Sequence, residues 1–121
     1  MEVFLDTNFI ISCVKKRIDF IDELLARGFR VIVPREVIHE LKDLRLNVTH
    51  TDRAAIDVAL QMFAGKGIEK GKLGGKTVDE GLIAKGKQGA YIATLDAAIK
   101  RVVPNKVVIL DATKNISIER S

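Results

Sequence analysis

The hydrophobic positions in the first half of the chain alternate between short continuous runs and runs with a helical period. The continuous runs at 2–5 and 30–33 are rich in branched and aromatic side chains, which is typical of strands covered on both faces. After each of them, apolar residues recur at intervals of three and four, as on one face of a helix. The pattern predicts strands at these two runs and helices at 9–14, 18–27, 34–44 and 54–64.

The chain changes composition between residues 65 and 89. This stretch holds eight of the nine glycines and six lysines. Within it, 68–73 fits either a short strand or an exposed loop, and 77–87 has a helical pattern. The remaining periodicity predicts strands at 90–94 and 107–110, a helix at 96–102 and an edge strand at 116–118.

The alternation of strands and helices indicates the architecture. Parallel neighbouring strands need a crossover connection, so this order predicts an α/β fold of three α/β/α layers. At its centre we expect a parallel sheet of four to five strands, flanked by helices. The chain has 121 residues, close to the commonest domain size, and shows no internal repeat. A single domain spanning 1–121 is therefore expected.

Composition excludes some classes of protein. With 47% hydrophobic and 30% charged residues the chain is globular, and no apolar run reaches membrane-spanning length, so no membrane partner is expected. A lone cysteine, Cys13, cannot form an internal disulfide, which indicates a reducing, cytoplasmic location. The net charge of +4 leans toward polyanions, although a solvated surface of mixed charge gives a similar value.

Two acids stand just past predicted strands, Asp6 after the first and Asp96 after 90–94. In open α/β sheets, ligands bind beyond the carboxyl ends of the strands. If these two strands are neighbours where the strand order reverses, both carboxylates face one crevice. Asp and Asn are also good helix N-caps, so Asp6, Asn8 and Asp96 each have a purely structural interpretation.

Two further acids lie on predicted helices. Glu40 falls at the border of the apolar face of 34–44, whereas Glu36 and His39 point further away. Asp79 falls inside the apolar arc of its helix, and a buried carboxylate needs a base, a hydrogen-bond network or a metal. The alternative is a capping box over 77–80, with Asp79 near the positive end of the helix dipole.

Together these acids suggest a metal site. Asp6, Glu40, Asp79 and Asp96 would offer only hard oxygen ligands, without His or Cys. Such a set suits Mg²⁺ or Mn²⁺ and suits zinc poorly. Without a cation the carboxylates would repel one another, so a metal is part of the hypothesis.

Four motifs in this order resemble the PIN domain nucleases over essentially the whole chain. They are Asp6-Thr7-Asn8, Val37-Ile38-His39-Glu40-Leu41, Val78-Asp79 at the start of a helix, and Ala93-Thr94-Leu95-Asp96. The compact length and residues 6–11 are similar to archaeal members of the rRNA-processing type and to toxin-type members. One departure is Leu95, where a polar residue such as Asn often precedes the acid, but no carboxylate is lost.

The resemblance implies a sheet of strand order 3-2-1-4-5 and a divalent-metal-dependent endoribonuclease using Mg²⁺ or Mn²⁺. By position it makes Asp6, Glu40, Asp79 and Asp96 the metal-binding and catalytic quartet. Thr7, Asn8 and Thr94 match the supporting polar residues. RNA is the implied substrate, and a homodimer and an antitoxin or processing-complex partner are the implied associations.

Basic side chains supply candidate phosphate contacts, although loop lysines are more often only solvated. The candidates are Lys15, Lys16, Arg17, Lys72 and Lys76. Two rivals to the nuclease remain. An aspartyl-phosphate phosphotransferase would use Asp6 as its nucleophile but usually needs a second acid where this chain has Asn8. A non-catalytic RNA- or protein-binding module would predict the loss of an acid, and all four are present.

Overall fold

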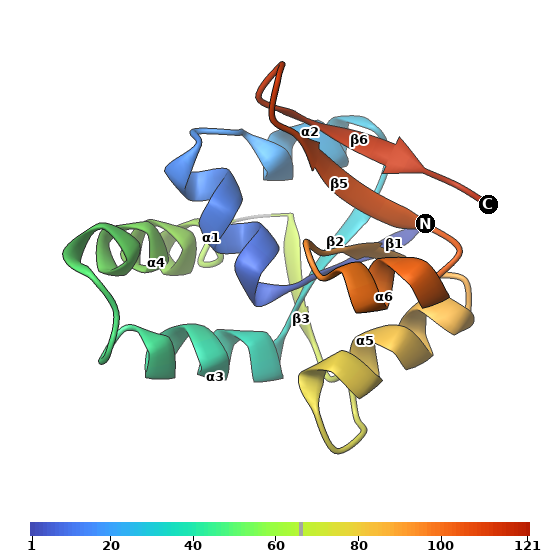
Figure 1. The fold of residues 1–121 in the computed structure, drawn as a ribbon, viewed down its shortest axis with the longest axis horizontal. Helices are drawn as coiled ribbons and strands as arrows, with labels where there is room; N and C mark the ends of the chain where they lie inside the picture. The colour runs from blue at the N-terminus through green and yellow to red at the C-terminus, as the bar shows by residue number, and fades with distance from the viewer. Residues whose placement is uncertain (66) are drawn as a thin grey trace.

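The fold is built on a mostly parallel sheet (Figure 1). The structure, a computed structural model, describes residues 1–65 and 67–121. Within them a six-stranded sheet has the order β3-β2-β1-β4-β5-β6, in which β6 alone runs antiparallel to its neighbour. The strands are β1 (Glu2–Leu5), β2 (Arg30–Pro34), β3 (Ile68–Gly71), β4 (Tyr91–Ala93), β5 (Lys106–Leu110) and β6 (Asn115–Glu119).

Helices cover both faces of the sheet. One face carries α1 (Thr7–Lys15), α2 (Phe20–Ala26), α3 (Arg35–Leu44) and α4 (His50–Met62). The other carries α5 (Val78–Lys87) and α6 (Ala97–Val102). Because successive side chains of a strand point to opposite faces, Val3 and Leu5 enter the first core and Phe4 enters the second. The expected α/β/α layers are confirmed.

The predicted strand order 3-2-1-4-5 is present, and β6 extends it at one edge. The expected edge strand at 116–118 lies within β6, which pairs with β5 from Asn115 to Glu119. The ambiguous stretch 68–73 contains a true strand, β3, which pairs with β2 in parallel.

Two helices begin earlier than their apolar patterns predict. The first was expected at 9–14, but α1 starts at Thr7, because the Asp6 side chain caps it by accepting from the Thr7 amide. The helix expected at 54–64 starts at His50, because the Thr49 side chain accepts from the Asp52 amide. Capping by polar residues extends both helices beyond their hydrophobic faces.

The strand order reverses at β1. From β1 the chain builds β2 and β3 to one side, and then crosses back to build β4 and β5 on the other. Val3 and Leu5 of β1 are in register with Tyr91 and Ala93 of β4. The carboxyl ends of β1 and β4 therefore meet at the point where open α/β sheets bind ligands.

The lone cysteine is a packing residue of α1. Cys13 is fully buried, and burial raises the pKa of its thiol to about 12. Within the described parts of the chain, no helix is long and apolar enough to cross a bilayer.

Candidate active site

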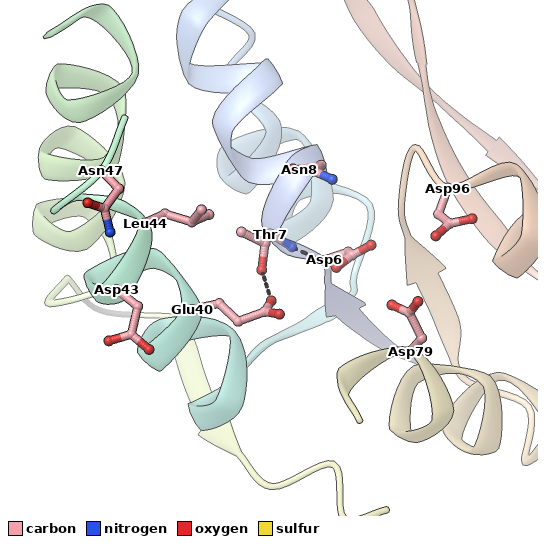
Figure 2. A pocket seen from close by; sticks show the side chains of 9 residues that line it. All are labelled: Asp6, Thr7, Asn8, Glu40, Asp43, Leu44, Asn47, Asp79 and Asp96. Atoms are coloured by element: carbon pink, nitrogen blue, oxygen red, sulfur yellow. Dashed lines mark hydrogen bonds between the residues drawn. The ribbon is translucent and has the colours of Figure 1, made fainter. Parts of the chain in front are cut away.

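A cavity of about 600 Å³ opens at the carboxyl ends of β1 and β4 (Figure 2). Its walls include all four acids singled out from the sequence, each from a different element or junction. Asp6 stands between β1 and α1, Glu40 on α3, Asp79 on α5, and Asp96 between β4 and α6. The other lining residues are Thr7, Asn8, Asp43, Leu44 and Asn47.

Asp6 is the most enclosed of the four acids, with 7% of its surface exposed. Its Oδ1 accepts a hydrogen bond from the Thr7 amide at 2.8 Å, and its Oδ2 accepts one from the Thr94 hydroxyl at 2.8 Å. Burial raises the pKa of Asp6 above its ordinary value, and the charges of Asp79 and Glu40 add to this, while the two hydrogen bonds oppose it. The fold therefore disfavours the ionised carboxylate in the absence of a cation.

Thr94 ties the two strand-end acids together. The side chain is fully buried, and its hydroxyl donates to Asp6 while accepting from the Asp96 amide at 3.0 Å. Asp96 in turn accepts from the Ala98 amide at 2.8 Å and so caps α6. Asp6 and Asp96 are thus helix caps and cavity residues at once, and the two interpretations are compatible.

Glu40 reaches the cavity from α3 and is exposed to solvent. Its carboxylate accepts a hydrogen bond from the Thr7 hydroxyl, drawn dashed in Figure 2. This contact orients Glu40 toward the end of β1. Helical geometry also predicts that Glu36 points away from the core, and this was wrong. Glu36 is half-buried, and its carboxylate accepts hydrogen bonds from the amides of Leu73 and Gly74. The loop before α5 returns over the start of α3, which helical geometry alone does not reveal.

The expectation that Asp79 is buried was also wrong. Asp79 is exposed, because the buried face of α5 is formed by Gly81, Leu82 and Gly86. Figure 2 shows its side chain pointing from α5 toward the part of the cavity where Asp6 and Asp96 lie. One bond of the expected capping box is present, since the Thr77 hydroxyl accepts from the Glu80 amide at 3.1 Å, but the Glu80 carboxylate accepts from the Lys76 amide at 3.2 Å and not from the Thr77 amide. Asp79 is therefore displayed at the mouth of the cavity by a well-capped helix.

Sequence reasoning missed three cavity residues beyond Glu40. Asp43, Leu44 and Asn47 continue the wall along and just past α3. They follow Glu40 at intervals of three, four and seven, which is the spacing of one helix face. That period was the available signal, and the polar character of Asp43 and Asn47 hid it among solvent-facing residues.

The basic candidates do not line this cavity. Lys15 pairs with Asp52 at 2.8 Å, and Lys16 pairs with Asp111. Both lysines line a second, adjoining pocket of about 750 Å³ that shares Asn8, Leu44 and Asp96 with the first. Arg17 follows α1, and Lys72 and Lys76 lie in the loop before α5. Lys15 and Lys16 thus line a pocket that Asp96 also lines, and the other three basic candidates line neither of these two pockets.

The donor chemistry of the cavity fits a hydrated hard cation. In the part of the chain that the structure describes, no group of three or more His, Cys, Asp or Glu side chains is arranged to hold a metal ion. The cavity nevertheless offers carboxylate, hydroxyl and amide oxygens. Mg²⁺ usually keeps several waters and takes only one or two carboxylates from the protein. The lining therefore suits such an ion and does not form a cage of direct ligands.

The protein is thus an α/β domain that gathers several carboxylates around a cavity at the point where the strand order reverses. The family described as "PIN like domain" matches residues 3–112. Since this match covers most of the chain, the protein belongs to the PIN-like domain family. A search of curated proteins found no match.

Several solved structures share the fold, and two of them are the following. The PIN domain endonuclease Utp24 matches with a TM-score of 0.75 and 20% identity, over 99% of this chain and 92% of that one. A chain of VapBC2 from Rickettsia felis, bound to a DNA fragment from their promoter, matches with a TM-score of 0.56 and 18% identity, over 97% of this chain and 100% of that one. The fold is therefore related to one that nucleases use.

Proposed function

We propose that the protein is a divalent-metal-dependent endoribonuclease that hydrolyses RNA phosphodiester bonds. The observation that carries the proposal is the meeting of Asp6, Glu40, Asp79 and Asp96 at one open cavity from four separate elements. Membership of the PIN-like family and the fold shared with an endonuclease support it. A non-catalytic binding module has no evident need for so many acids around one cavity.

The electrostatics of Asp6 support a cation as part of the site. Its pKa is raised by burial and by the neighbouring charges of Asp79 and Glu40. A divalent ion would offset that repulsion and stabilise the ionised side chains. We assign Asp6 and Asp96 to hold the main Mg²⁺ or Mn²⁺, with Asp79 completing the site and Glu40 binding a second ion or orienting the attacking water.

The residues of the chain then divide the work of hydrolysis. A divalent ion held by these residues would lower the pKa of the attacking water and offset charge on the departing oxygen. Glu40, held by the Thr7 hydroxyl, faces the cavity as the group that orients the water. The water attacks phosphorus in line with the bond to the departing 3′ oxygen, forms a new P–O bond and gives up a proton. The bond to the 3′ oxygen breaks, and this oxygen takes up a proton. The products carry a 5′-phosphate and a 3′-hydroxyl.

Binding of RNA would rest on charge rather than on stacking, because aromatic residues make up only 5% of the chain. Lys15 and Lys16 are the best-placed phosphate contacts, since their pocket adjoins the acids. Their ion pairs with Asp52 and Asp111 are partly exposed, and such pairs exchange for other partners at little cost. Arg17, Lys72 and Lys76 are proposed as more peripheral contacts.

The biological setting is proposed as rRNA processing or a toxin-type role. The resemblance of the four motifs to PIN domain members of the rRNA-processing and toxin types supports these two settings, and the fold is shared with the PIN domain endonuclease Utp24 and with a VapBC2 chain. An antitoxin, a processing complex or a second copy of the chain are the proposed partners.

Cleavage of a structured RNA by the purified protein tests the proposal. We expect cutting with Mn²⁺ and none with EDTA. Asp79→Asn should lower the rate by at least about 10- to 100-fold, the cost of losing a residue that supports a bound metal. The matched control is Glu80→Gln, on the same helical turn but outside the cavity, which should keep the wild-type rate.

Two outcomes would contradict the proposal. Cutting that persists in EDTA would exclude the metal, and full activity in Asp79→Asn would remove that residue from the site. If the wild-type protein binds the RNA and cuts under no condition, the binding-module alternative is favoured instead.

A further inference from the structure

The helices that carry Glu40 and Asp79 belong to opposite layers of the molecule. On α3, Val37 and Leu41 pack in the core with α1, α2 and α4, whereas Leu82 of α5 packs in the core of the other face. Figure 2 shows α3 and α5 on either side of the end of β1. Neither core by itself therefore sets the separation of these two carboxylates across the cavity.

Glu36 supplies a direct connection between the two layers. It lies one helical turn before Glu40 on α3, so the two side chains share a face of that helix. Its carboxylate accepts the Leu73 amide at 3.0 and 3.2 Å and the Gly74 amide at 3.3 Å. Both oxygens thus hold the loop that leads into α5.

The Glu36 carboxylate is charged at neutral pH, which strengthens these bonds. Burial acts to raise the pKa of Glu36, but hydrogen bonds from its own amide and from Leu73 and Gly74, together with the charge of Lys72, hold it below its ordinary value. Hydrogen bonds to an ionised acceptor are stronger than those between neutral groups.

The loop that Glu36 holds is in direct contact with α5. Leu73 is 7% exposed and packs in the same core as Leu82. A Cβ added at Gly81 would lie 2.5 Å from the Leu73 Cβ and 2.8 Å from the Gly74 carbonyl oxygen, so the loop lies against the backbone of α5. Gly81 follows Asp79 by two residues. If the loop at Leu73 and Gly74 moved, the first turn of α5, which carries Asp79, would therefore move with it.

We propose that Glu36 is a positioning residue of the acidic cavity: by fastening the Leu73–Gly74 loop to α3, it holds Asp79 in place opposite Glu40. Glu36 is not part of the cavity wall and acts only through the loop. The inference rests on the proposed function of the cavity.

The test compares Glu36→Ala and Glu36→Gln with a matched control, Glu69→Ala. Glu69 lies on β3 just before the loop, and its carboxylate accepts two bonds from Arg30, at 2.9 and 2.7 Å. Its removal thus breaks comparable polar contacts without touching the amides of Leu73 and Gly74. Two readouts are used: steady-state RNA cleavage with Mn²⁺, and amide hydrogen exchange of the metal-free protein.

For Glu36→Ala we expect kcat to fall about 10- to 100-fold with KM within about twofold of wild type, because misplacement of a reacting group affects mainly the transition state. The amides of Leu73, Gly74 and the first turn of α5 should exchange at least about tenfold faster. Glu36→Gln keeps one acceptor oxygen and should show a smaller loss, and Glu69→Ala should change neither readout.

A kcat of Glu36→Ala within about twofold of wild type, or unchanged exchange at these amides, would overturn the proposal. If Glu36→Ala does not fold, the same criteria apply to Glu36→Gln. If the wild-type protein cuts no RNA, the proposed function fails. Amide hydrogen exchange then decides by itself whether Glu36 positions the loop and α5. Faster exchange confined to the loop and α5 would support it, and unchanged exchange would overturn it.

Discussion

At the scale of single residues, Asp6 combines a structural role with a charge that the fold disfavours. Its carboxylate caps α1 and binds the Thr94 hydroxyl, yet burial and the nearby acids raise its pKa. A group that served only as a cap would not need Asp79 and Glu40 beside it. This combination is common where a residue is kept for function at some expense of stability.

The raised pKa of Asp6 predicts a pH-dependent effect of Asp6→Asn on stability. A carboxyl whose pKa is higher in the folded than in the unfolded chain stabilises the fold at low pH, and this contribution is lost as pH rises through the folded-state pKa. In EDTA, the free energy of unfolding of Asp6→Asn relative to wild type should therefore increase from about pH 4 to pH 7. Urea unfolding across this range measures the difference.

A difference that stays constant or falls with pH would contradict the inferred state of Asp6. Addition of Mn²⁺ provides the internal control. It should stabilise the wild-type protein, because an ion that binds only the folded state shifts the equilibrium, and it should stabilise Asp6→Asn less.

At the scale of elements, α5 packs closely against its neighbours at two glycines, where a larger side chain would collide with neighbouring residues. Gly81 faces the loop before the helix, and Gly86 faces the connection after α6. At Gly86 an added Cβ would lie 2.5 Å from the Val103 Cγ1 and 3.1 Å from the Ile92 Cγ1. Close approach here lets α5 pack against β4 and α6 while its first turn presents Asp79.

We therefore predict that Gly86→Ala destabilises the protein by about 1–3 kcal/mol, because overpacking outweighs the gain of up to about 1 kcal/mol in helix propensity. Urea unfolding measures this change. The control is Ala84→Gly at an exposed position of α5, which should cost about 1 kcal/mol from propensity alone. A Gly86→Ala protein more stable than wild type would show that α5 is not packed this closely.

At the scale of the whole molecule, the C-terminal strand completes a core that begins at the N-terminus. The family match ends at residue 112, yet β6 pairs with β5 beyond that point and buries Ile116, which is 2% exposed. Ile116 packs in the same core as Val3, Phe9 and Val107. The edge strand is thus part of the hydrophobic core and not an appendage.

Ile116→Ala should accordingly cost about 2–5 kcal/mol of stability, since it removes buried methyl groups and leaves a cavity. RNA cleavage per folded molecule should not change, because β6 lies outside the acidic cavity. The control is Val102→Ala, a branched side chain that is 47% exposed and should alter stability by no more than about 0.5 kcal/mol. Equal stability of the two variants would mean that β6 does not contribute to the core.

The pattern of residues along the chain determined the layered α/β fold and singled out Asp6 and Asp96. Strands buried on both faces produce continuous apolar runs, and acids just past such runs stand out because their neighbours are apolar, as at Asp6 and Asp96. The strand order came from the family resemblance, because local periodicity carries no information on which strands become neighbours.

Tertiary structure alone decided how the side chains of the helices are used. Helical geometry alone predicts that Asp79 points inward and Glu36 outward. In the fold, Asp79 is exposed at the cavity, and the Glu36 carboxylate accepts hydrogen bonds from the loop at Leu73 and Gly74. The placement of α5 depends on Gly81 and Gly86 meeting residues remote along the chain. The physical reason is that a helix face is defined by what packs against it, and those partners are set by long-range contacts.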